Sequence, residues 1–208
     1  DFLTKQFEEA YAMKDHLTHV SPRVQNRNLP YTPVAPSDTM QNEPDTDFDL
    51  SQNQEWVRRI FAKWKKSGTE EPEIIPLQIG AETVVCKNRY KYLDRCQNDE
   101  VCICEMSQAD SAQVEKIIEI AETDPAGWRK TTLEERHRIM YEAANRLADM
   151  RGDLIGCMCA VTGKTVIEGD VEVSEAVDYA RFYTTAMKKF AALDDIEIKP
   201  KGTILVIS

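Results

Sequence analysis

Residues Trp128–Tyr183 read WRKTTLEERHRIMYEAANRLADMRGDLIGCMCAVTGKTVIEGDVEVSEAVDYARFY, and this stretch decides the predicted fold. After the capping-box pattern Thr132–Glu135, apolar residues recur at helical spacing as far as Met158, which predicts one long amphipathic helix. Gly163 interrupts the spacing, and a second long helix is expected to begin just after it. The pattern therefore predicts two long helices joined by a tight elbow.

The elbow contains Gly163-Lys164-Thr165, which is also how a phosphate-binding loop ends. That motif needs another glycine where this sequence has Met158, and it must follow a strand rather than a helix. We therefore interpret Gly163 as a helix terminator, and Lys164 and Thr165 as residues that cap or brace the elbow.

The rest of the chain predicts an α/β fold. Strand-forming runs lie between residues 74 and 106, with the polar stretch 87–99 as a connection. A helix capped by Ser51 precedes them, and a helix with the capping box Asp110–Gln113 follows them. The final run, Thr203–Ile207, is apolar throughout, like the first buried parallel strand of a Rossmann-like nucleotide-binding sheet. Because such a strand needs partners, we expect an N-terminal fragment of a larger protein.

Residues 1–49 differ in composition from the rest. Residues 1–19 have apolar residues at helical spacing and predict a short amphipathic helix. Residues 20–49 contain five prolines and many polar residues, which predicts an extended interdomain linker. The predicted organisation is the terminal helix of an upstream domain at 1–19, a linker at 20–49, and the N-terminal part of a second domain at 50–208.

The composition excludes several classes of protein. A net charge of −10, from 36 acidic and 26 basic residues, argues against a general nucleic-acid binder. No apolar run approaches the roughly 20 residues that span a bilayer, and the first residues lack signal-peptide features. We therefore expect no transmembrane segment and a cytoplasmic location.

The cysteines and histidines show no metal-ligand spacing. No C-x-x-C occurs, so the thiols are expected to be reduced and mostly buried. We expect the histidines at the surface and the tryptophans in packing roles. These residues are Cys86, Cys96, Cys102, Cys104, Cys157, Cys159, His16, His19, His137, Trp56, Trp64 and Trp128.

Glu175, Asp178 and Arg181 are spaced three residues apart, so they share one face of the second long helix. One interpretation is a solvated charged face. The other is that an acidic side chain kept beside aromatic residues binds the amine of a substrate. The residues alone leave both interpretations open.

The ordered motifs across residues 74–208 resemble the N-terminal third of the aldehyde dehydrogenase superfamily. They are WRKTTLEERHRIMYEAANRLADMRGDLI at 128–155, the TGKT elbow, SEAVDYARFY at 174–183 and PKGTILVIS at 200–208. SEAVDYARFY is most similar to the glutamate-semialdehyde (1-pyrroline-5-carboxylate) dehydrogenases. The resemblance implies an NAD-dependent enzyme that oxidises a small-molecule substrate, L-glutamate γ-semialdehyde, to glutamate.

The resemblance also implies roles for individual residues. It assigns Glu175 to the contact with the substrate's ammonium group, and Ile207 and Ser208 to the backbone that lines the NAD pocket. The family's reactive cysteine and water-activating glutamate fall downstream, so no catalytic residue is expected in this chain, which alone should be inactive. The alternatives are a non-catalytic helical interaction module and an aldehyde dehydrogenase of different substrate specificity.

Two further segments bear on partners. NEPDTDFDL at 42–50 resembles the join in bifunctional proline-utilisation proteins. In those proteins a proline dehydrogenase barrel with bound FAD precedes the aldehyde dehydrogenase. DFLTKQF at 1–7 resembles the last helix of that barrel. The implied partner is the remainder of the same polypeptide. The connection Leu193–Lys201 is shorter than the hairpin through which the family usually oligomerises, so a homo-oligomer stays an open alternative.

Overall fold

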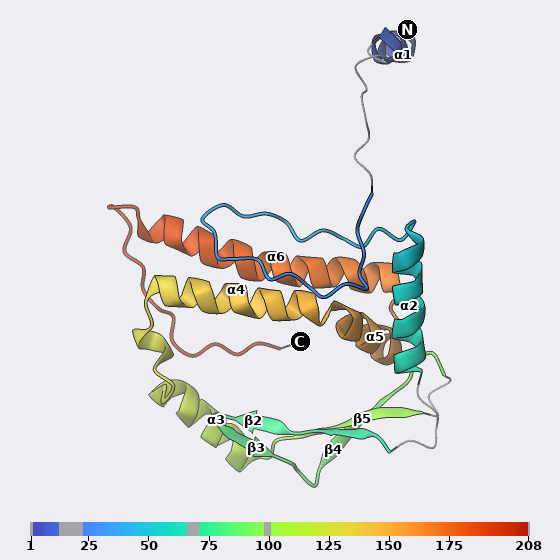
Figure 1. The fold of residues 1–208 in the computed structure, drawn as a ribbon. Coiled ribbons are helices and arrows are strands. Elements are labelled where there is room, and N and C mark those ends of the chain that lie inside the picture. The colour runs from blue at the N-terminus through green and yellow to red at the C-terminus, as the bar shows by residue number, and fades with distance from the viewer. Residues whose placement is uncertain (1, 13–22, 66–70, 98–100, 208) are drawn as a thin grey trace.

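The computed structural model describes residues 2–12, 23–65, 71–97 and 101–207, and it places a layer of helices over small β-sheets (Figure 1). The elements in chain order are α1 (Phe2–Ala12), α2 (Ser51–Trp64), β1 (Glu73–Ile75), β2 (Leu77–Ile79), β3 (Glu82–Val84), β4 (Arg89–Leu93), β5 (Cys102–Ser107), α3 (Ser111–Thr123), the short 3-10 helix η1 (Trp128–Lys130), α4 (Leu133–Asp149), α5 (Arg151–Thr162) and α6 (Val166–Ala191). The α/β class is confirmed. None of the described helices has both the length and the apolar character needed to cross a membrane.

The strands form two small sheets. β5 is the centre of the first, with β1 parallel on one side and β4 antiparallel on the other, while β2 and β3 form an antiparallel pair. β4 lies in the stretch predicted to be a polar connection, so that prediction was wrong. Arg89 and Lys91 of β4 pair with Glu105 of β5 at 3.0 and 3.6 Å, which shows how a polar run can still form a strand.

The hydrophobic core lies between α4, α5 and α6. Short side chains on α4, such as Ala144, face Val173 and Val177 of α6, and Ile155 of α5 completes the centre. Ala144, Val177 and Ile155 have no exposed surface. Small residues on α4 allow the helix backbones to approach closely, so α4 packs along α6 (Figure 1).

The first long helix of the prediction is in fact two helices. α4 ends at Asp149 and α5 begins at Arg151, with Met150 between them at φ −84° and ψ 7°. The apolar spacing continues through this break, which is why periodicity predicted one helix. The break turns α5 away from the α4 axis (Figure 1), and the Arg151 side chain is only 2% exposed.

The helix ends mostly follow the predicted caps. Asp110, Thr132 and Thr165 each accept a hydrogen bond from the backbone N–H three residues later, within complete capping boxes. Gly163 ends α5 at φ 72°, a conformation that favours glycine. The Ser51 cap was wrong, because Leu50 has the extended backbone of the N-cap and Ser51 is already helical.

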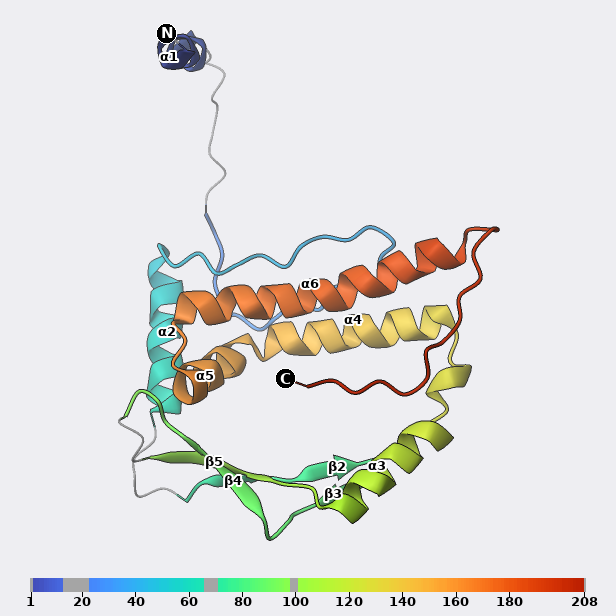
Figure 2. The same cartoon turned by 180° about the vertical axis from the view of Figure 1, so that it is seen from behind.

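Residues 23–49, called here the N-terminal strap, form no helix or strand, as predicted. The strap is nevertheless packed against the helices, and both views show it running along α6 (Figures 1 and 2). Its Glu43 and Thr46 are each 6% exposed. Thr46 donates from its backbone N–H and its hydroxyl to the Asp170 carboxylate, both at 2.6 Å. The strap is therefore an integral layer of the helical unit.

The predicted strand Thr203–Ile207 is not a strand in this structure. The side chains from Ile204 to Ile207 are 69–86% exposed, and residues 201–207 have no regular secondary structure. A strand needs a neighbour to receive its backbone hydrogen bonds, and no described strand pairs with this segment.

Two predictions about individual residue types also need correction. His137 is buried, at 4% exposure, where its ring lies 4.7 Å from that of Tyr141, whereas His16 and His19 lie outside the described residues. All six thiols are free, but only Cys159 is buried and Cys96 is exposed, so the prediction of mostly buried thiols was wrong. His137 is in helical register with Tyr141, Ala144 and Ala148, the other buried residues of α4, so its burial follows the periodicity of the helix.

Candidate functional site

A buried cluster of charged side chains joins the strap to α5 and α6. Arg151 lies 2.8 Å from Asp170 and 3.3 Å from Glu43, and Arg181 lies 3.2 Å from the other oxygen of Glu43. All four side chains are 1–4% exposed. Desolvated charges are tolerated because each has an opposite partner. Arg181 is therefore not part of a solvated face.

Tyr31 of the strap extends this cluster. Its hydroxyl accepts from Arg181 Nη2 at 2.9 Å and donates to Asn145 Oδ1 at 3.2 Å. Burial raises the pKa of Tyr31, so its hydroxyl stays protonated and able to donate at neutral pH. The strap is thereby tied to α4 as well as to α6.

Asp178 is also held by the strap. One carboxylate oxygen accepts from Asn42 Nδ2 at 2.6 Å, and the other accepts from the backbone N–H of Glu43 at 2.7 Å. Both oxygens are therefore engaged within the protein. Asp178 fixes the position of the strap along α6.

Glu175 differs from these neighbours because its side chain is exposed. It lies in an open groove of about 480 Å³, bounded by strap residues 40–45 on one side and by the α6 face from Val171 to Tyr183 on the other. We call this the Glu175 groove. A volume of this size is in the range of small-molecule sites.

Aromatic residues line the groove that holds the Glu175 carboxylate. The Tyr179 hydroxyl donates to it at 2.8 Å and is the single hydrogen-bond donor to it among the described residues. This hydrogen bond raises the pKa of Tyr179, so the phenol remains a donor at neutral pH. The Tyr183 ring lies 5.7 Å from that of Tyr179, and Phe182 is also exposed. A carboxylate beside aromatic faces suits an ammonium group.

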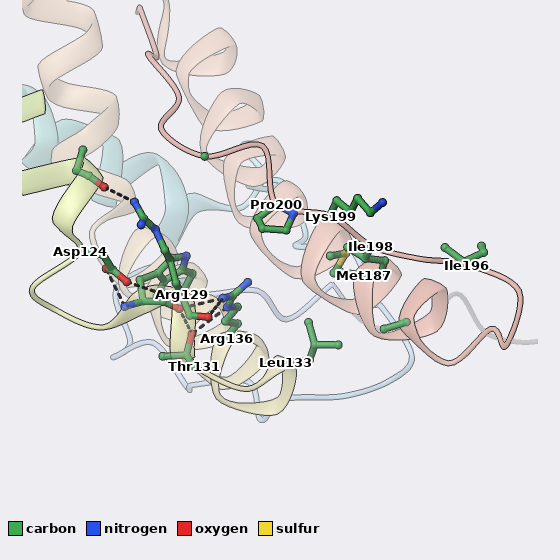
Figure 3. Close-up of a pocket in the computed structure, with 14 residues that line it drawn as sticks. Asp124, Arg129, Thr131, Leu133, Arg136, Met187, Ile196, Ile198, Lys199 and Pro200 are labelled. Atoms are coloured by element: carbon green, nitrogen blue, oxygen red, sulfur yellow. Dashed lines mark hydrogen bonds between the residues drawn. The ribbon is translucent and has the colours of Figure 1, made fainter.

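A larger cleft of about 700 Å³ lies beside η1 and the C-terminal segment (Figure 3). Its charged groups are engaged in local structure. Asp124 accepts from the backbone N–H groups of Trp128 and Arg129, and Arg136 donates to the Trp128 carbonyl and to the Thr131 hydroxyl, both at 2.9 Å. The Arg136 guanidinium also lies 5.2 Å from the centre of the Trp128 ring. These groups hold the 124–131 turn, so this cleft is a weaker candidate for chemistry.

The described residues do not enclose a dinucleotide. Ile207 is 86% exposed in a segment without regular structure, and Ser208 lies outside the described residues. No group of three or more His, Cys, Asp or Glu side chains within the described ranges is arranged to hold a metal ion. The Glu175 groove is therefore the candidate site.

Sequence reasoning identified Glu175 but missed the residues that build its surroundings. Asn42 and Glu43 lie in a segment interpreted as a linker, and Arg151 lies within an apparently uninterrupted helix. The available signal was the motif NEPDTDFDL, whose acidic residues have no basic residue close to them in the sequence. Only Glu43 among these acidic residues is buried, and it pairs with the distant Arg151 and Arg181.

The chain is similar to known proteins. Residues 86–208 match the model of the aldehyde dehydrogenase family. The chain belongs to the aldehyde dehydrogenase family. This confirms the resemblance inferred from the motifs, and the matched residues include α3, α4, α5 and α6.

Relatives of this family member carry a specific name. The 1-pyrroline-5-carboxylate dehydrogenase of Geobacillus sp. (strain WCH70) is 29% identical over 78% of this chain and 31% of its own length. The enzyme of that name from Bacillus pumilus (strain SAFR-032) is 26% identical over 72% of this chain and 28% of its own. The chain thus spans about a third of the length of these relatives.

Solved structures show the same fold. Proline utilization A (PutA) from Bdellovibrio bacteriovorus has a TM-score of 0.68 at 21% identity, over 85% of this chain and 17% of its own. The 1-pyrroline-5-carboxylate dehydrogenase from Thermus with bound NAD has a TM-score of 0.68 at 23% identity, over 78% of this chain and 30% of its own.

Proposed function

We propose that this chain is the N-terminal part of an NAD-dependent L-glutamate γ-semialdehyde (1-pyrroline-5-carboxylate) dehydrogenase that acts in proline catabolism. The family match and the names of its relatives support the reaction class. The observation that carries the substrate assignment is the exposed Glu175 carboxylate in an aromatic-lined groove.

In this proposal, Glu175 binds the α-ammonium group of the semialdehyde. Tyr179 donates to one oxygen of the carboxylate and restricts its rotamer, which leaves the other oxygen to accept from the ammonium group. Asp178 cannot serve equally well, because Asn42 and Glu43 occupy both its oxygens. Glu175 therefore selects amino-acid aldehydes over aldehydes that lack an amine.

The chemical groups of the reaction are proposed to lie in the remainder of the polypeptide, so that this chain alone is inactive. NAD, when bound, would accept the hydride released from the aldehyde carbon. The resemblance assigns Ile207 and Ser208 to the NAD pocket, and we propose that the rest of that pocket comes from the remaining polypeptide. The contribution of the described residues is to bind and orient the substrate.

We also propose that a proline dehydrogenase domain with bound FAD precedes this chain, and that the protein is cytoplasmic. The support is the resemblance of residues 1–7 and 42–50 to the join in proline-utilisation proteins. Purified intact polypeptide should then show flavin absorbance and should oxidise proline. An intact polypeptide without flavin would remove the fusion from the proposal.

The substrate role is tested by Glu175→Gln in the full-length enzyme. Losing a charge-assisted hydrogen bond costs about 1.5–3 kcal/mol, so kcat/KM for glutamate semialdehyde should fall roughly 10- to 100-fold. A plain aliphatic aldehyde should be affected much less. Glu172→Gln, which removes an exposed carboxylate three residues earlier on α6, is the matched control and should leave both substrates unchanged.

Two outcomes would contradict the proposal in different ways. Equal effects of Glu175→Gln on both aldehydes would remove the ammonium-binding role but leave an aldehyde dehydrogenase. A full-length protein that oxidises no aldehyde with NAD would favour the non-catalytic helical module instead.

A further inference from the structure

A small apolar cavity of about 180 Å³ lies away from the Glu175 groove, between α2, the end of α5 and the turn after β4. Trp64 and Phe61 of α2 line one side. Two thiols from distant parts of the chain, Cys96 and Cys159, line the cavity as well. Neither thiol has a role in the proposed function.

The turn that carries Cys96 is held rigidly against α5. The Asp94 carboxylate, which is 3% exposed, accepts from the Cys96 backbone N–H at 2.8 Å and from the Gln97 side chain at 2.7 Å. The Arg95 backbone N–H donates to the Ala160 carbonyl at 2.8 Å. Cys96 Sγ then lies 3.4 Å from the carbonyl oxygen of Cys159. Cys96, in the turn after β4, and Cys159, on α5, therefore lie next to each other where these two segments are in contact.

The two thiols differ in accessibility. Cys96 is exposed, whereas Cys159 is 6% exposed and belongs to the core. Burial raises the pKa of Cys159, which keeps it a protonated thiol at neutral pH. An oxidant from solvent therefore meets Cys96 first, and Cys159 is protected until Cys96 has reacted.

We propose that Cys96 and Cys159 form a reversible disulfide when the chain encounters a hydroperoxide. The Cys96 thiol would be oxidised by hydrogen peroxide to a sulfenic acid, with release of one water. The Cys159 thiol would then lose its proton as its sulfur attacks the Cys96 sulfur and forms the S–S bond. That proton and the hydroxide expelled from Cys96 leave together as a second water. Two thiol hydrogens and one peroxide are consumed for each disulfide.

The bond would link the turn after β4 to α5 across a sequence separation of 63 residues. Closing a loop of this size restricts the unfolded chain, so the oxidised form should have a higher Tm than the reduced form. Dithiothreitol should restore the original Tm.

The experiment treats the reduced chain with a small excess of hydrogen peroxide and measures the intact mass and Tm. Most molecules should lose 2 Da, and digestion with trypsin and a glutamate-specific protease should yield a linked pair of peptides. Cleavage after Glu100 separates Cys96 from Cys102 and Cys104. Cys157 and Cys159 stay on one peptide, so the serine variants decide which of the two is the partner. Cys96→Ser and Cys159→Ser should each abolish the 2 Da loss. Cys157→Ser, on the same helix, should retain it.

Cys159→Ser provides an independent check, because Cys96 should then accumulate as a sulfenic acid that reacts with dimedone. A disulfide between other cysteines would overturn the proposal. The proposal would also be overturned if, in the wild-type chain after peroxide treatment, Cys96 reacted with dimedone and the intact mass showed no 2 Da loss.

Discussion

Arg151 and Asp170 form an ion pair at 2.8 Å with side chains only 2% and 1% exposed. Removing one member of a buried pair leaves the other charge without compensation, which costs much more than the pair itself contributes. Glu43 extends this pair from the strap, because it contacts both Arg151 and Arg181. The strap is consequently part of the buried ion-pair network rather than a free tether.

Glu43→Ala should destabilise the chain by about 3–5 kcal/mol, because it leaves two buried guanidinium groups with fewer partners. Urea unfolding followed by circular dichroism measures this change. Glu142→Ala, which removes a half-exposed carboxylate paired with Arg146, is the control and should be close to wild type. Similar midpoints for the two variants would show that the buried network does not contribute to stability.

Starting the chain at Arg23 should leave the urea midpoint unchanged, because α1 side chains such as Phe7 are exposed. Starting it at Leu50 should abolish the cooperative transition, because Glu43 and Thr46 are lost together. If the shorter chain unfolds at the same urea concentration as the longer one, the strap is not part of the folded unit.

Gly156→Ala should destabilise α5 by about 1–3 kcal/mol, as overpacking generally does. A Cβ atom at this position would lie 2.2 Å from Trp64 Cδ1, so the indole ring would have to move. Gly152→Ala in the same helix meets Trp56 at an ordinary 3.4 Å and should be neutral or stabilising, since alanine favours helix. Thermal unfolding of both variants measures the change in Tm, which should be a decrease for Gly156→Ala and no change or an increase for Gly152→Ala. A lower Tm for Gly152→Ala together with an unchanged Tm for Gly156→Ala would contradict this prediction.

Glu168 should contribute to acid stability. Its carboxylate accepts from the Thr165 backbone N–H and hydroxyl, which lowers its pKa below the usual 4.5. A depressed pKa in the folded state means that the stabilisation is present above pH 4.5 and is lost as the pH falls through the folded-state value. Glu168→Gln should therefore be less stable than wild type at pH 7, and the difference should disappear as the pH falls through the folded-state pKa of Glu168. Parallel curves of urea midpoint against pH would disprove this contribution.

Local signals in the sequence account for the helix ends but not for the tertiary network. Asp110, Thr132 and Thr165 cap helices through atoms three residues away, so sequence spacing is sufficient to find them. Glu43 and Arg181 are 138 residues apart, and their pairing follows no periodicity.

The same reasoning explains the errors in the strands. β4 forms because charged residues pair across strands, which an apolar pattern cannot reveal. Thr203–Ile207 has the composition of a buried strand, but the described chain offers no neighbouring strand to pair with it. The role of Glu175 was suggested by family resemblance. Its distinction from Asp178 and Arg181 required the structure.

The strap also imposes an order of events during synthesis on the ribosome. Thr46 cannot be buried against Asp170 until the ribosome has added the 124 residues that separate them. Glu43 likewise cannot pair with Arg181 until Arg181 has been synthesised. At about 5–20 residues per second, this delay is on the order of 10 s. During that interval residues 23–49 must stay hydrated and available, and their prolines and acidic side chains suit them to remain soluble until α6 emerges.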